Sequence, residues 1–219
     1  MEIRRTASVD EKEPTFKSKK SIVDIKSVLK EHNFYDGQIE IDYVLDGEFT
    51  ADKNKDLIFV STSEDFMVIL KGTAAGQYEF SQLVRTYEGP INPYAFDVNE
   101  DGVDELVVSH MKNKNSMIFA YNGEKMRYQH NLETGKYVAG FSLEKSDEKK
   151  SLVAVTYFSG SLMRFEHWAK VYFQRVAVES TPLVQKGIWF NHFDMDQDGR
   201  MDYVLSDFRG NKLLFVYGE

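Results

Sequence analysis

The chain contains no cysteine and only four prolines among its 219 residues. Without thiols it cannot build a disulfide framework, a thiolate nucleophile or a Cys-ligated zinc site. It also lacks any apolar run near the roughly 18 residues that a membrane-spanning helix needs. The first 20 residues contain no apolar segment typical of a signal peptide. These absences fit a cytoplasmic protein, or the mature or trimmed form of an exported one.

A basic surface is missing as well. The chain carries 35 Asp and Glu against 27 Lys and Arg, which gives a net charge of −8. Such a surface repels phosphate backbones, so nucleic acid is excluded as a partner. Much of the acid lies in two short Asp-rich segments, which indicates bound cations. Hydrophobic residues make up 42% and aromatic residues 14%, which predicts a folded, β-rich globular protein.

Two segments of the sequence repeat each other: FDVNEDGVDELVVSH at 96–110 and FDMDQDGRMDYVLSD at 193–207. Each has a Phe, an Asp-rich loop with one Gly, and an apolar run, and a second apolar run follows. More degenerate copies begin near residues 56 and 151. The first apolar runs open at Asp56, Glu105, Ser151 and Asp202, at spacings of 49, 46 and 51 residues. A period near 50 is typical of propeller blades.

Apolar runs of four to eight residues, rich in β-branched side chains, are of strand length. The best repeat contains four of them, PYAFDV, ELVVSHM, SMIFAYNG and KMRYQHNLE, which predict one antiparallel blade. The expected fold is therefore an all-β propeller of about four four-stranded blades, either four-bladed or part of a larger ring. We predict a flexible charged arm at 1–20 and one propeller domain at 21–219.

The last repeat ends after its third apolar run, so its blade lacks a fourth strand in the sequence. Residues 21–35, SIVDIKSVLKEHNFY, fit two structures. They can supply the missing outer strand, or they can form a short helix, since their apolar residues also follow helical spacing. A second copy of the chain could also complete the ring.

The Asp-rich loops place oxygen ligands at alternating positions. When each loop is counted from Asp97 or Asp194 as position 1, position 6 is Gly102 or Gly199. Glycine permits a sharp turn of the backbone there. An oxygen-only, multiply anionic cage suits Ca²⁺ better than Mg²⁺. An EF-hand is excluded, because its bidentate Glu at position 12 is replaced by Val108 or Leu205. The predicted ligands at positions 1, 3, 5, 7 (by its carbonyl) and 9 are Asp97, Asn99, Asp101, Val103 and Glu105, and Asp194, Asp196, Asp198, Arg200 and Asp202.

The pattern D-x-[DN]-x-DG-x-x-[DE] followed by a short apolar strand resembles the FG-GAP/VCBS repeat of integrin α-subunit propellers and many bacterial secreted proteins. The resemblance covers about residues 37–219. It implies a β-propeller with Ca²⁺ in loops on one face, and an extracellular or periplasmic location. We expect about two calcium ions with a structural role, since clustered carboxylates repel one another without a cation.

Two loops depart from this pattern. In EFTADKNKD at 48–56, Lys53 replaces the Gly, and oxygen ligands remain only at Glu48, Thr50, Asp52 and Asp56. In LEKSDEKKS at 143–151, Lys145 occupies a ligand position and Ser151 closes the loop, so no metal is expected. A lysine ammonium can replace the charge of a cation in such a loop.

The sequence shows no assembled catalytic set. The five histidines lack metal-motif spacing, and there is no G-x-S-x-G elbow or P-loop. We therefore predict a non-catalytic, calcium-stabilised scaffold or protein-interaction module, with a protein or a glycan as partner. One alternative is a carbohydrate-binding lectin that uses rim aromatics such as Trp168. Another is a polysaccharide lyase or hydrolase with a site in the central channel. A cleft where His, Arg or Tyr converge beside a calcium would favour this last reading.

Overall fold

The computed structural model describes residues 24–31, 39–145, 149–180, 188–207 and 212–218. The chain divides into two compact units, Met1–Asp36 and Gly37–Glu219. The described part of the first unit is one helix, α1 (Ile25–Glu31). Asp24 caps it, because its carboxylate accepts hydrogen bonds from the amide and hydroxyl of Ser27. The helical interpretation of residues 25–31 therefore holds.

The rest of the segment 21–35 and the predicted arm at 1–20 lie outside the described residues. Helix α1 has only seven residues. In the part of the chain that the structure describes, no helix has the length and hydropathy required to span a bilayer.

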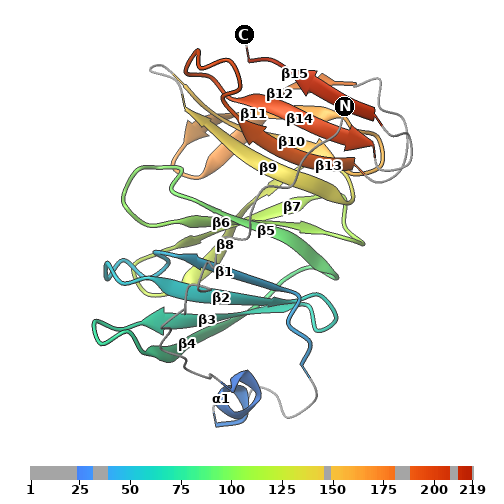
Figure 1. The fold of residues 1–219 in the computed structure, drawn as a ribbon. Coiled ribbons are helices and arrows are strands. Elements are labelled where there is room, and N and C mark those ends of the chain that lie inside the picture. Colours follow the sequence, from blue (N-terminus) through green and yellow to red (C-terminus); the bar gives the residue numbers. More distant parts are fainter. Residues whose placement is uncertain (1–23, 32–38, 146–148, 181–187, 208–211, 219) are drawn as a thin grey trace, which may run out of the picture. The chain divides into compact units, whose positions relative to one another are not determined.

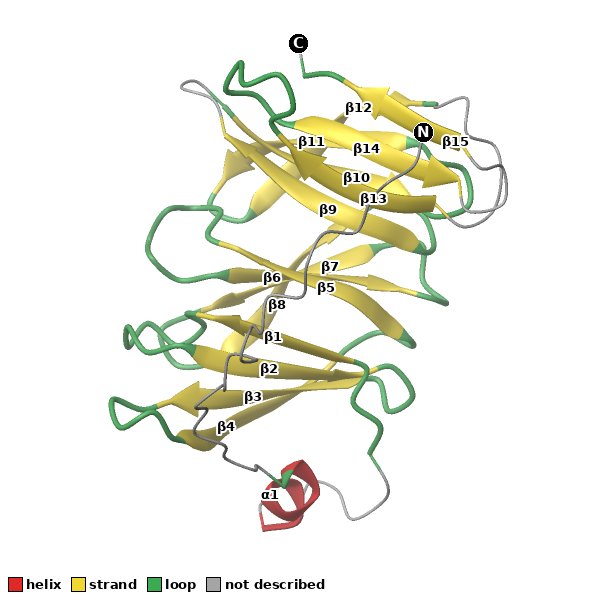
Figure 2. Ribbon diagram, in the orientation of Figure 1, coloured by secondary structure: helices red, strands yellow, loops and turns green. Residues whose placement is uncertain are grey.

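The second unit is all-β, and its four antiparallel sheets are the blades of a β-propeller, as predicted (Figures 1 and 2). Blade 1 contains β1 (Tyr43–Gly47), β2 (Asp56–Ser61), β3 (Phe66–Gly72) and β4 (Tyr78–Arg85). Blade 2 contains β5 (Pro90–Phe96), β6 (Glu105–His110), β7 (Ser116–Tyr121) and β8 (Met126–Leu132). Blade 3 contains β9 (Val138–Lys145), β10 (Lys150–Thr156), β11 (Leu162–Ala169) and β12 (Tyr172–Glu179). Blade 4 contains β13 (Ile188–Phe193), β14 (Asp202–Asp207) and β15 (Lys212–Val216).

The sequence period corresponds to one blade. Asp56, Glu105 and Asp202 each open the second strand of their blade, and Ser151 is the second residue of β10. Within blades 2 and 4 the register is the same, since Phe96 pairs with Glu105 as Phe193 pairs with Asp202. Strands β13, β14 and β15 form a three-stranded sheet among the described residues, which agrees with the missing fourth run in the sequence.

The hydrophobic core lies between the blades rather than inside any one of them. Strand β6 is buried along its whole length, so alternate side chains face opposite neighbours. Leu106 packs with Ile58 of blade 1, whereas Val107 packs with Leu152 of blade 3. A third cluster joins blade 3 to blade 4 through residues such as Leu205. Each blade therefore needs its neighbour to bury the faces of its middle strands.

We expect Phe119→Ala to lower the free energy of unfolding by about 3–5 kcal/mol. Phe119 lies in β7, is 1% exposed and belongs to the cluster shared by blades 1 and 2. Urea denaturation followed by tryptophan fluorescence measures the change. The control is Phe215→Ala, at a side chain that is 46% exposed. Equal losses for the two variants would contradict a core placed between the blades.

Candidate metal loops and adjoining cavity

Three loops joining the first and second strands of their blades share one backbone form. Loop 1 is Glu48–Asp56, loop 2 is Asp97–Glu105 and loop 4 is Asp194–Asp202. In each, the fourth and sixth residues adopt the left-handed conformation. Their φ angles are 59° and 67° at Ala51 and Lys53, 62° and 83° at Glu100 and Gly102, and 63° and 89° at Gln197 and Gly199. Glycine tolerates this conformation best, yet loop 1 adopts it with a lysine.

The ninth residue of each loop anchors it with a buried carboxylate. Asp56, Glu105 and Asp202 are 0%, 2% and 1% exposed. Each accepts a hydrogen bond from the amide of the second loop residue, at 2.8 Å from Phe49, 2.9 Å from Val98 and 2.7 Å from Met195. Because this bond closes the loop onto the strand that follows, it fixes where the other carboxylates lie.

The second oxygen of the anchoring carboxylate also has a partner. In loops 1 and 4 it accepts an amide hydrogen from the glycine near the end of the third strand, Gly72 at 2.8 Å and Gly218 at 2.9 Å. The Gly218 amide is the largest cause that holds the pKa of Asp202 below its ordinary value. In loop 2 the longer Glu105 side chain accepts from Asn99 instead, at 3.2 Å.

Loop 4 gathers a cluster of carboxylates suited to a metal ion. Asp194, Asp196 and Asp202 each bring one oxygen within 4.8 Å of the others. The amides of Asp198 and Gly199 donate to the Asp194 carboxylate and hold it in place, at 3.1 and 2.9 Å. Three oxygens of this kind fit a hard divalent cation, so this cluster could hold a metal ion.

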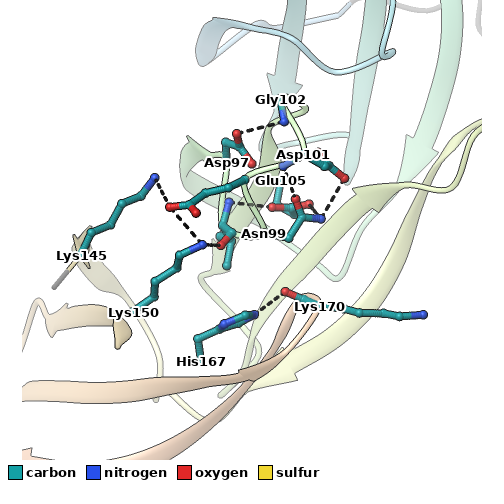
Figure 3. Close-up of polar contacts among 11 residues, drawn as sticks. Asp97, Asn99, Asp101, Gly102, Glu105, Lys145, Lys150, His167 and Lys170 are labelled. Carbon is teal, nitrogen blue, oxygen red and sulfur yellow. Dashed lines mark hydrogen bonds and ion pairs between the residues drawn. The ribbon is translucent and has the colours of Figure 1, made fainter. Parts of the chain in front are cut away.

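Loop 2 shows two signs of a missing positive charge (Figure 3). The Asp97 Oδ1 atom is buried and has no hydrogen-bond partner in the described structure. Burial, with the charges of Asp101 and Asp97 as smaller causes, raises the pKa of Glu105 from 4.5 to about 7. A cation would pair the Asp97 oxygen and offset the repulsion among the three carboxylates, so the donor set fits a metal ion.

The remaining predicted ligands of loops 2 and 4 lie in the same turns. Asp101 and Asp198 each accept the amide hydrogen of the residue two positions later, Val103 at 2.9 Å and Arg200 at 2.8 Å. The carbonyl groups of Val103 and Arg200 stay predicted metal ligands, and so do the other side chains predicted for loops 2 and 4.

Loop 1 keeps the turn with fewer carboxylates. The Glu48 Oε1 atom accepts the amide hydrogen of Asp52 at 3.0 Å, and Asp52 accepts that of Asn54 at 2.8 Å. Thr50 Oγ1 is buried without a partner in the described structure. The ammonium of Lys71 lies 3.2 Å from Asp52 Oδ2.

The loops of neighbouring blades are tied together at this end of the strands. The backbone amide of Asp104 donates to the Glu48 carbonyl at 2.7 Å, and the Glu48 amide donates to the Asp104 carboxylate at 2.9 Å. From blade 3, Lys145 and Lys150 reach Glu100 of loop 2, at 3.4 and 3.1 Å. Sequence reasoning placed Lys145 in the loop of its own blade and missed Lys150, because only the packing of blades shows such contacts.

Lys150 also contacts the backbone of loop 2. Its ammonium donates to the carbonyl oxygen of Val98 at 2.9 Å, and Figure 3 shows it beside the loop. Blade 3 thus provides two positive charges to loop 2, both at its exposed side.

A cavity of about 710 Å³ lies between blade 3 and loop 4. Arg164 of β11 pairs with Glu144 of β9 through both guanidinium nitrogens, and Lys149 pairs with Glu166 at 3.3 Å. Burial raises the pKa of Glu144, and the Arg164 charge opposes that rise. The lining residues are Leu143, Glu144, Lys145, Lys149, Ser151, Arg164, Glu166, Asp198, Gly199, Arg200, Met201 and Gly218.

Sequence reasoning did not identify this cavity. Glu144 and Arg164 are single polar residues in strands and belong to no motif. They meet only because β9 and β11 flank β10 in the same sheet. The one signal of this pair in the sequence is the alternation of side chains along each strand, which places Glu144 and Arg164 on the same face of the sheet.

No family model matches the sequence, and no curated protein matches it either. The fold is similar to that of the periplasmic gluconolactonase PpgL of Pseudomonas aeruginosa, with a TM-score of 0.55 and 15% identity. That match covers 82% of this chain and 58% of the gluconolactonase. A protein from Lactobacillus plantarum also matches, with a TM-score of 0.49, 15% identity and 82% and 55% coverage. The chain thus spans little more than half the length of these proteins.

These findings change the interpretation of the sequence. The propeller is supported, but the FG-GAP/VCBS family is not, since no family model matches. The prediction of a non-catalytic scaffold, and of no enzyme, is wrong, because the similar propeller is a gluconolactonase and so a hydrolase. The prediction rested on the absence of linear catalytic motifs from the sequence, and such motifs do not record residues that come together only in the fold.

We expect the stability of the metal-free protein to fall as the pH rises from about 4.5 to about 7. Over this interval folded Glu105 keeps a proton that the unfolded chain releases, so the native state binds more protons and loses stability with rising pH. Glu105→Gln should remove the part of this fall that Glu105 causes, and the raised pKa of Glu144 should leave a smaller fall in the variant. Urea titrations in the presence of a chelator measure it.

The matched control is Glu124→Gln, at an exposed position of the β7–β8 turn. It should leave the pH dependence of the wild type unchanged. The same fall in both variants would contradict the role of Glu105.

Proposed function

We propose that the protein is a hydrolase that acts on a cyclic ester derived from a sugar, in the cavity between blade 3 and loop 4. The observation that carries this proposal is the meeting of Glu144, Arg164 and Arg200 at one cavity beside an acidic loop. A cleft where His, Arg or Tyr converge beside a calcium is the feature expected from the sequence to favour a polysaccharide lyase or hydrolase, and this cavity brings two arginines together beside a candidate metal loop. The likeness to a gluconolactonase adds support.

Hydrolysis of an ester needs a base for the attacking water and positive charge for the developing oxyanion. Glu144 is the candidate base, because its burial raises its pKa toward neutrality, where a general base works best. Arg164 of β11 holds that carboxylate of β9 across the intervening strand β10. Arg200, whose loop forms the opposite wall, is the candidate donor to the oxyanion.

We further propose that the metal ions are Ca²⁺, about two per chain, held by loops 2 and 4 through the ligands predicted above. All the donors are oxygens and the loops turn sharply, and in loop 4 three carboxylates lie around one centre, which suits the flexible coordination of Ca²⁺. When bound, the ion neutralises the carboxylates and fixes the loop. In loop 4 this would hold Asp198, Gly199 and Arg200 in the wall of the cavity.

We propose a periplasmic or extracellular location, since the similar gluconolactonase is described as periplasmic. In this setting the partner is the small sugar-derived substrate. A second copy of the chain that completes the ring stays a proposal alongside it.

We expect the Ca²⁺-loaded protein to accelerate the hydrolysis of gluconolactone, and Glu144→Gln to lower kcat by about 10²-fold or more, since a general base typically contributes that much. A pH-stat assay measures the rate over the spontaneous reaction. The acidic limb of the pH–rate profile, which reports the titration of the general base, should disappear in the variant.

The control for this assay is again Glu124→Gln, which lies far from the cavity lining in sequence and is exposed. It should keep the wild-type rate. Absence of any rate above the spontaneous one in the wild type, or full activity of Glu144→Gln, would contradict the proposed function.

We expect native mass spectrometry to find two Ca²⁺ ions per chain and none after chelation. Asp202→Asn should remove the ion of loop 4 and Glu105→Gln that of loop 2, because each variant loses an anchoring carboxylate. Circular dichroism of each variant checks that the strands persist. Fewer than two ions in the wild type would contradict the metal assignment.

A further inference from the structure

We propose that Lys71 is a tethered replacement for the metal ion in loop 1, so that blade 1 excludes the cation that loops 2 and 4 bind. The inference rests on the calcium sites proposed for those two loops. It makes Lys71 the residue that sets metal selectivity among the three loops.

The first support is the shared form of the three loops. Loop 1 has the same left-handed fourth and sixth residues and the same bond from its second amide to its ninth carboxylate as the other two. Lys53 does not prevent this turn, although it stands where loops 2 and 4 have glycine. The backbone therefore does not distinguish a metal-binding loop from an empty one, and the side chains around it must do so.

The second support is the position of Lys71 in its blade. Lys71 precedes Gly72, whose amide donates to Asp56. In blade 4 the corresponding residue is Tyr217, which precedes Gly218, whose amide donates to Asp202. Blade 1 thus carries a cation at the edge of its loop where blade 4 carries a neutral ring.

The third support is the direction of the ammonium group. It lies 3.2 Å from Asp52, the fifth loop residue. Asp52, and more weakly Asp56 at the ninth position, raise the pKa of Lys71. The ammonium therefore contacts the fifth position of loop 1, whose counterpart in loop 4, Asp198, is a predicted ligand of the ion.

The fourth support is the charge of the loop itself. Its third residue is Thr50, which is uncharged like Asn99 of loop 2, whereas loop 4 has Asp196, so the Lys71 ammonium is the charge that sets loop 1 apart from loop 2. Like charges repel steeply at a few ångströms, so a divalent ion beside the Lys71 ammonium would be disfavoured. The Lys71–Asp52 pair is partly exposed, with side chains 43% and 22% accessible, and such pairs contribute little to stability. Its proposed effect is on selectivity.

The test counts Ca²⁺ ions by native mass spectrometry in the wild type and in Lys71→Met, which keeps the length of the side chain and removes its charge. We expect the variant to bind one ion more than the wild type. Adding Asp52→Asn to that variant should remove the extra ion. The control is Lys55→Met, whose ammonium lies 3.9 Å from Asp46, and it should leave the count unchanged.

Hydrogen exchange gives a second readout, in the wild type and in the variant. In the wild type, chelation should raise exchange in loops 2 and 4 by tenfold or more and leave residues 48–56 unchanged. In Lys71→Met, residues 48–56 should become sensitive to the chelator.

The outcomes separate the two proposals. An equal ion count in the wild type and Lys71→Met, or chelator-sensitive exchange at residues 48–56 of the wild type, would overturn the role of Lys71. A wild-type count below two would overturn the sites of loops 2 and 4, whereas a gain of one ion in Lys71→Met would still support the inference for loop 1.

Discussion

The hydrogen bond from the second loop residue to the buried carboxylate at the ninth position is the interaction on which this end of the blades depends. It recurs in blades 1, 2 and 4, at 2.7–2.9 Å, with Asp56, Glu105 and Asp202 as acceptors. A buried carboxylate is costly unless hydrogen bonds or opposite charge compensate it. Asp202 accepts from the amides of Met195 and Gly218, and its pKa is lowered. Glu105 also accepts two hydrogen bonds, from Val98 and Asn99, but burial outweighs them and raises its pKa.

The loops thus share one backbone form, but their carboxylates are compensated by positive charge in different ways. Loop 2 receives Lys145 and Lys150 of blade 3 at its outer side, through Glu100, but its inner carboxylates still lack compensation. Loop 1 receives an ammonium from its own blade. Positive charge therefore reaches equivalent loops from a neighbouring blade or from the same blade, and the proposed metal ions would be a third source. Since the same loops also link neighbouring blades, their charge balance bears on how the blades pack.

The proposed hydrolase site depends on the same arrangement. Its cavity has one wall from strands of blade 3 and the other from loop 4. The blade 3 wall is held by strand pairing and the Arg164–Glu144 pair. The loop 4 wall is held by amides around Asp194 and by the anchor at Asp202. A rigid scaffold with a loop as one wall is a common basis for a reaction site, because loops can vary without disturbing the core.

The sequence by itself determined the repeat, the position of the strands and the acidic loops, since these follow from local patterns: apolar runs of strand length and alternating oxygens around Gly102 and Gly199. The three apolar runs of the last repeat also correspond to the three strands that blade 4 has among the described residues. Only the tertiary structure decided that Lys71 faces Asp52, that Lys150 reaches loop 2 and that Glu144 meets Arg164 beside Arg200. Those contacts join residues far apart in the chain, and their geometry is set by strand register and the packing of blades. Local sequence patterns do not contain that geometry, so the proposed hydrolase site could be identified only in the folded structure.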